Sequence, residues 1–130
     1  MPAEIRQQDG LTLTILQYSD RAGCIVVRLS GTELRAEITS EWSSAADKAS
    51  RLDEFFASVA QLEEAASKDW LSECEDFALS ACLDPDFPGL VSLRVYLGST
   101  SDDDCDWQIN ASLLVTPSQV ERFAKDFSAI

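Results

Sequence analysis

The segment LTLTILQYSDRAGCIVVRLSGTELRAEITSEW, residues 11–42, alternates apolar and polar residues in three blocks. A period of two is typical of a half-buried strand, so the blocks predict strands over 11–18, 24–29 and 34–42. The middle block is apolar almost throughout, which favours a central strand covered on both sides. Short runs of turn residues separate the blocks. We therefore expect an antiparallel meander of three strands.

The second half of the chain shows the same alternation after a helical segment. Apolar residues recur at every second position over 77–83, 91–97 and 107–115, which predicts three further strands. Between the two groups the apolar spacing changes to three and four residues, which predicts an amphipathic helix. Either Ser44 or Ser50 can cap it, so two starts stay open. Its apolar stripe consists of Leu52, Phe55, Phe56, Val59 and Leu62.

The C-terminal segment carries the signals of a helix start. Thr116 is a favourable N-cap, Pro117 suits the first helical position, and Gln119 completes a capping box with Thr116. A terminal helix should therefore dock on the strands. Its apolar stripe consists of Val120, Phe123, Ala124 and Phe127.

Together these elements predict an α+β fold in which residues 1–130 form a single two-layer domain. The strands come in runs joined by tight turns, so we expect one antiparallel sheet of about six strands. The order is βββ-α-βββ-α, with the two helices packed against the sheet. No internal repeat is evident among the residues. Residues 1–10 should form either a polar, loosely held N-terminus or a short edge strand.

The composition is that of an ordinary globular domain, with 45% hydrophobic and 25% charged residues. The N-terminal residues resemble no secretion signal and no apolar run reaches membrane-spanning length, so we expect a cytoplasmic protein without membrane contacts. The chain has no histidine. We expect reduced thiols, no metal and no cofactor, although the spacing leaves open a metal held by all the cysteines. These cysteines are Cys24, Cys74, Cys82 and Cys105.

The sequence argues against enzymatic activity and against nucleic-acid binding. Without histidine there is no standard general base for a serine or cysteine nucleophile. The lysines and arginines show no phosphate-binding spacing and no glycine-rich loop. We therefore expect no catalytic residue. A net charge of −13 repels a nucleic-acid polyanion, because binding one needs a basic stripe.

The negative charge is concentrated in one part of the chain. Residues 63–106 hold twelve acids and only two bases, Lys68 and Arg94, which accounts for ten of the thirteen excess negative charges. Glu63 and Glu64 should fall in the last turn of the first helix, where the helix dipole disfavours anions. Features that cost stability without a structural return point to function. The alternative is an acidic surface that only keeps the protein soluble.

The predicted topology brings distant acids together. If the last three strands pair in chain order, the start of the first strand and the connection between the other two lie at one end of the sheet. Seven carboxylates should then crowd that end and repel one another. An EF-hand calcium loop would need glycine and glutamate where the chain has Trp107 and Leu113, so a solvated loop is expected, with an irregular calcium site as the alternative. The predicted partner-binding residues are Glu73, Glu75, Asp76, Asp102, Asp103, Asp104, Asp106 and Trp107.

The layout resembles a bacterial family, the WapI-type immunity proteins of contact-dependent toxin systems, and a similar bacterial domain family of unknown function. The shared positions are Trp42 at the end of the third strand, the apolar stripe of the first helix, Leu93-x-Val95-x-Leu97, and Trp107 followed by Val120-x-x-Phe123-Ala124. These are packing positions, and neither family supplies a catalytic motif. The resemblance implies a small intracellular protein that holds another protein.

The leading hypothesis is a protein-binding domain, an immunity-type inhibitor whose acidic end docks on a basic protein such as a toxin domain. Attraction between opposite charges would speed the encounter. The first alternative is an accessory domain without a toxin partner. The second is a small-ligand-binding domain with a pocket between helix and sheet. The sequence does not fix the oligomeric state.

Overall fold

The computed structural model describes residues 3–19, 24–41, 52–63, 66–71, 76–98 and 107–128. Within them the order of elements is ββββα, twice in succession. The elements are β1 (Ala3–Arg6), β2 (Thr12–Ser19), β3 (Cys24–Gly31), β4 (Leu34–Glu41), α1 (Leu52–Val59), β5 (Ser67–Leu71), β6 (Phe77–Leu83), β7 (Val91–Gly98), β8 (Gln108–Val115) and α2 (Pro117–Ser128). The chain therefore repeats its architecture, although its residues show no evident repeat.

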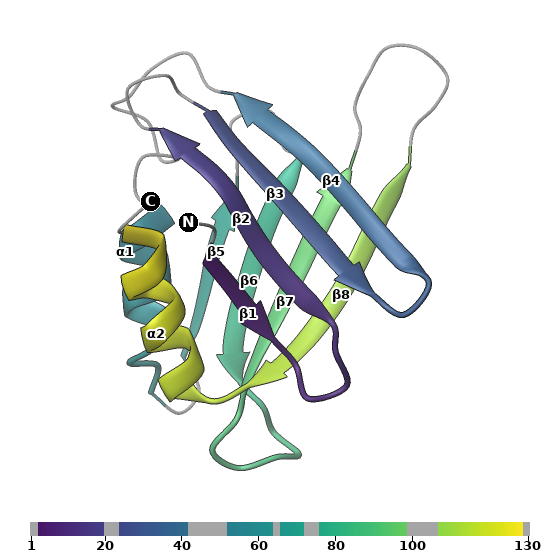
Figure 1. Ribbon diagram of the computed structural model, residues 1–130. Helices are drawn as coiled ribbons and strands as arrows, with labels where there is room; N and C mark the ends of the chain where they lie inside the picture. Colours follow the sequence, from purple (N-terminus) through teal and green to yellow (C-terminus); the bar gives the residue numbers. More distant parts are fainter. Residues whose placement is uncertain are drawn as a thin grey trace.

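The strands form two four-stranded antiparallel sheets rather than one sheet of about six strands. Sheet A has the order β1-β2-β3-β4 and sheet B the order β5-β6-β7-β8. The sheets lie face to face with their strands crossing, and the two helices lie side by side along the flank formed by β1 and β5 (Figure 1). The predicted α+β class and the chain-order meanders are confirmed, and the single sheet is wrong.

The two strands that the alternation did not reveal are short edge strands. β1 has the sequence AEIR and β5 has SKDWL, and only Trp70 is buried in β5. An edge strand covered on one face needs few apolar residues, so its pattern is weak. β1 lies within residues 1–10. The addition of one edge strand to each meander gives the two sheets.

The core lies between the sheets and is closed on one side by the helices. In β7 the residues Val91, Leu93, Val95 and Leu97 are buried, while the positions between them are half-buried or exposed. β3 is central in its sheet, as predicted, but its outward residues Val26 and Arg28 are only half-buried. Sheet A therefore covers its core on one face, and the expectation that β3 is covered on both sides is wrong.

The helices pack on each other through aromatic rings. The ring centroid of Phe56 on α1 lies 4.7 Å from that of Phe123 and 5.8 Å from that of Phe127, both on α2. Phe127 also contacts Tyr18 of β2, with ring centroids 4.7 Å apart. Edge-to-face contacts of this kind add to the stabilisation from apolar burial. The aromatic cluster thus fixes the helix pair against sheet A.

The predicted N-terminus of α2 is confirmed, whereas the predicted end of the first helix is wrong. The N–H of Gln119 donates to Oγ1 of Thr116 at 3.1 Å, and the N–H of Thr116 donates to Oε1 of Gln119 at 2.8 Å. This is a capping box. α1 ends at Val59, so Glu63 lies beyond the helix and escapes the unfavourable dipole. Glu64 and the possible caps Ser44 and Ser50 lie outside the described residues.

The turn between β1 and β2 joins the N-terminal hairpin to the other half of the molecule. Oε1 of Gln7 accepts a hydrogen bond of 2.7 Å from the N–H of Leu114 on β8. Nε2 of Gln119 donates to the carbonyl of Arg6 at 2.9 Å. In the same turn, hydrogen bonds from the N–H of Leu11 and the side chain of Gln7 lower the pKa of Asp9. Both glutamines therefore link sheet A to the β8–α2 segment.

Candidate functional site

Two of the eight predicted partner-binding residues, Asp76 and Trp107, fall in the part of the chain that the structure describes. The other six lie outside the described residues. They are Glu73, Glu75, Asp102, Asp103, Asp104 and Asp106. Trp42, a position of the proposed resemblance, lies outside the described residues as well.

The topology that was expected to gather the acids is present in sheet B. β6, β7 and β8 pair in chain order, with Phe77 opposite Leu97 and Leu97 opposite Ile109. The N–H of Gly98 donates to the carbonyl of Asp76 at 2.9 Å. Asp76, Gly98 and Gln108, the neighbour of Trp107, therefore lie at the same end of sheet B. We name this region the acidic end: Asp76, Gly98 and Trp107, with the sequence segments 72–75 and 99–106 that attach to them.

Asp76 has a structural partner that the sequence did not indicate. Oγ of Ser40 on β4 donates to Oδ1 of Asp76 at 2.8 Å. Ser40 is 0% exposed and Asp76 is half-buried. A buried hydroxyl needs such a partner, because an unsatisfied polar group costs free energy. The carboxylate of Asp76 thus joins the two sheets in addition to carrying charge at the acidic end.

The two tryptophans near this end differ in exposure. Trp107, just before β8, is 38% exposed. Trp70 of β5 is buried, and its ring centroid lies 5.1 Å from that of Phe77. Partly exposed tryptophans are frequent anchors of protein interfaces, because a large ring gains much contact area on binding. Of the two, Trp107 is the one that can contact a partner.

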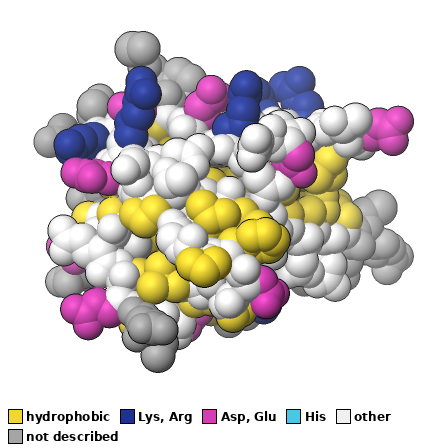
Figure 2. All heavy atoms as spheres, turned by 90° about the horizontal axis from the view of Figure 1, so that it is seen from below, with side chains coloured by type: hydrophobic (Ala, Val, Ile, Leu, Met, Phe, Trp, Pro, Cys, Tyr) yellow, Lys and Arg dark blue, Asp and Glu magenta, His cyan; other side chains and the backbone are white. Residues whose placement is uncertain are grey.

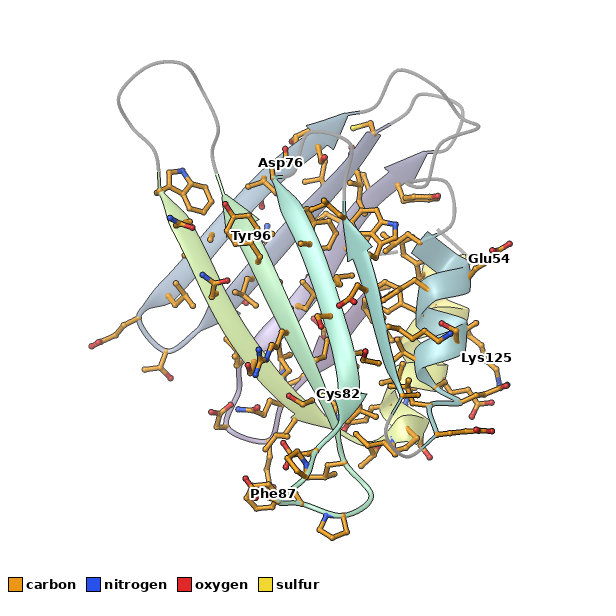
Figure 3. The ribbon with its side chains drawn as sticks, turned by 180° about the vertical axis from the view of Figure 1, so that it is seen from behind. Glu54, Asp76, Cys82, Phe87, Tyr96 and Lys125 are labelled. Atoms are coloured by element: carbon orange, nitrogen blue, oxygen red, sulfur yellow. The ribbon has the colours of Figure 1, made fainter. Side chains whose placement is uncertain are left out.

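The outer face of sheet B, which is turned away from sheet A, is hollowed into a trough of about 1100 Å³. Figure 3 views this face, with Tyr96 on β7 and with α1, which carries Glu54, on the flank of β5. The register of the four strands places the outward residues of the trough in two rows. One row is Asp69, Ser80, Arg94 and Ser112, and the next is Leu71, Ala78, Tyr96 and Asn110.

Sequence reasoning missed this trough. Its residues occupy ordinary outward positions of four strands, and only the cross-strand register shows that they are neighbours. One signal was available, since Arg94 is one of only two bases among residues 63–106. Arg94 is exposed and makes no ion pair among the residues that the structure describes.

The end of sheet B opposite the acidic end is apolar. Figure 2 shows apolar side chains gathered in the middle of this surface. Phe87, in the connection between β6 and β7, is 52% exposed. Oδ1 of Asp84 accepts hydrogen bonds from the N–H groups of Asp86 at 2.8 Å and Phe87 at 3.0 Å, which orders the connection. Figure 3 shows Phe87 and Asp76 at opposite ends of the sheet.

Other kinds of site find no support in the described part of the chain. Its residues include no group of three cysteine, aspartate or glutamate side chains placed to hold a metal ion. Cys24 and Cys82 are free thiols, while Cys74 and Cys105 lie outside the described residues. Neither α1 nor α2 has the length and apolar character that a membrane-crossing helix needs.

Comparison with known proteins gave no match. No protein-family model matches the chain, and no curated protein or solved structure matches it significantly. The resemblance to the WapI-type immunity proteins therefore stays a prediction from the packing positions.

Proposed function

We propose that the chain is a protein-binding domain whose acidic end docks on a basic surface of another protein. The observation that carries this proposal is the hydrogen bond from Gly98 to Asp76, together with the chain-order pairing of β6, β7 and β8. Both acidic segments of the sequence attach to this one end. Segment 72–75 contributes Glu73 and Glu75, and segment 99–106 contributes four aspartates.

Electrostatics supports a role in binding rather than in folding. Like charges within a few ångströms near a surface repel by roughly 1 to a few kcal/mol per pair, so a cluster of acids costs stability. The same cluster attracts a basic partner over about 10 Å at low salt and accelerates encounter. Trp107, exposed beside these charges, provides the apolar contact that slows dissociation.

Within this proposal the partner is the basic surface of a toxin domain, such as the rim of a nuclease active site, and the chain acts as its immunity-type inhibitor. An accessory domain without a toxin partner is the rival. A toxin gene directly upstream would favour the inhibitor, and its absence would favour the rival. The proposed activity is binding, and it assigns no reaction to the chain.

The proposal is tested by capture of basic proteins from a bacterial lysate at low salt, with identification of the bound proteins by mass spectrometry. One variant carries asparagine at Asp102, Asp103, Asp104 and Asp106. A matched control removes the same charge elsewhere, through Glu4→Gln, Glu33→Gln, Asp86→Asn and Glu121→Gln, four exposed positions outside the acidic end. A third variant, Phe87→Ser, tests the apolar end.

The parent chain, the control and Phe87→Ser should capture the same basic protein, and the loop variant should lose it. Loss of capture by the control and the loop variant alike would show that only total charge matters. Equal recovery by all four proteins would refute the assignment of the 99–106 segment.

A further inference from the structure

The trough on the outer face of sheet B has a floor of small side chains. Ala78 and Ser80 on β6 and Ser112 on β8 flank β7, whose outward residues here are Arg94 and Tyr96. Short neighbours leave the two larger side chains accessible from both sides. The volume of about 1100 Å³ matches the upper end of the range of roughly 300–1,000 Å³ that is typical of small-molecule sites.

Arg94 lies in the row of polar residues. Ser80 and Ser112 are its cross-strand neighbours, so a hydroxyl group flanks it on each side. Asp69 shares the row but lies two strands away, at a backbone separation of roughly 10 Å. Neither Arg94 nor Asp69 makes an ion pair within the described ranges. A guanidinium group with free N–H donors and hydroxyl neighbours suits a carboxylate, which it can bind through two parallel hydrogen bonds.

The adjacent row is suited to an apolar group. Leu71, which is 47% exposed, and the ring of Tyr96 stand on either side of Ala78. Asp69 and Glu54 line the α1 side of the trough. Their carboxylates would repel a second negative charge on a ligand. The lining therefore favours one carboxylate attached to an apolar body over a dicarboxylate or a phosphate ester.

We propose that this trough binds a small apolar monocarboxylate, with Arg94 holding the carboxylate and Leu71, Ala78 and Tyr96 contacting the apolar body. The carboxylate belongs either to a free organic acid or to the C-terminus of a peptide. The trough lies on a face of sheet B and the acidic end lies at its edge, so this inference does not depend on the proposed protein-binding function.

The test is a titration of the ¹⁵N-labelled protein followed by NMR. The probes are phenylacetate and its neutral counterpart phenylacetamide. A second pair, acetyl-Ala-Phe with a free C-terminus and the same peptide as its amide, separates the two sources of carboxylate. The variants are Arg94→Gln and the matched control Arg35→Gln, which removes an equally exposed arginine from the outer face of sheet A. Unchanged amide spectra elsewhere establish that both variants fold.

Phenylacetate should give saturable shifts confined to residues 78–80, 94–96 and 110–112, and phenylacetamide should give none. Arg94→Gln should weaken binding at least about tenfold, because a charge-assisted hydrogen-bonded pair is lost, and Arg35→Gln should leave it unchanged. Tighter binding of the free peptide than of phenylacetate would identify a chain terminus as the source. Equal binding of acid and amide, equal loss in both variants, or no saturable shift at millimolar probe would overturn the proposal.

Discussion

Ser40 of β4 and Asp76 at the start of β6 join the two sheets through a hydrogen bond of 2.8 Å between Oγ and Oδ1. The serine is fully buried, and both residues are separated by a helix and a strand in the chain. This contact gives Asp76 a role in stability that must be kept apart from any role in binding. A substitution that removes charge but retains an acceptor is therefore needed at this position.

Ser40→Ala should lower the free energy of unfolding by roughly 1 to 2 kcal/mol, because the half-buried carboxylate of Asp76 loses a donor. Asp76→Asn should cost less than Asp76→Ala, since the amide oxygen can still accept from Ser40. Urea denaturation measures all three values. An unchanged midpoint for Ser40→Ala would show that the bond contributes no net stability.

Gln119 should contribute more to stability than its capping-box partner Thr116. Thr116→Ala removes one cap and should cost about 1 kcal/mol. Gln119→Ala removes the reciprocal bond and also the bond from Nε2 to the carbonyl of Arg6, which ties α2 to β1. The difference between the two variants in thermal or urea unfolding checks this. If Thr116→Ala were the more costly change, the link to Arg6 would be without effect.

Gly98 should tolerate a methyl group only if Tyr96 moves. A Cβ at this position would lie 2.9 Å from Cζ of Tyr96 and closer still to its hydroxyl oxygen. Gly98→Ala should therefore cost about 1 to 3 kcal/mol and displace the tyrosine ring from the trough. In a Tyr96→Ala background the same change should cost much less. Equal costs in both backgrounds, measured as a double-mutant cycle, would exclude the predicted clash.

Local patterns predicted most elements of the fold but not how the strands divide into sheets. The alternation identified β2, β3, β4, β6, β7 and β8, and the Thr116–Gln119 box identified the start of α2. β1 and β5 escaped because short edge strands carry few apolar residues. Alternation marks a buried face but does not say which sheet covers it, so two stacked sheets and one larger sheet give the same pattern.

The candidate sites were predictable to the degree that chain-order pairing decides them. Adjacent hairpins necessarily bring Asp76 and Gly98 to one end, so the acidic end follows from the meander. The neighbours of Asp76 and Arg94 do not follow in this way. Ser40 belongs to the other sheet, and the row that contains Arg94 depends on the exact register of four strands. Contacts between sheets and across several strands are not encoded by local periodicity.

The most direct test of the proposed protein-binding function is hydrogen–deuterium exchange on the chain alone and in complex with the captured basic protein. Backbone amides of residues 76–78 and 107–110 should become protected in the complex, while those of residues 84–90, at the opposite end of sheet B, should exchange as before. Protection of residues 84–90 with no change at 107–110 would contradict the account, because the partner would then bind the apolar end instead of the acidic end.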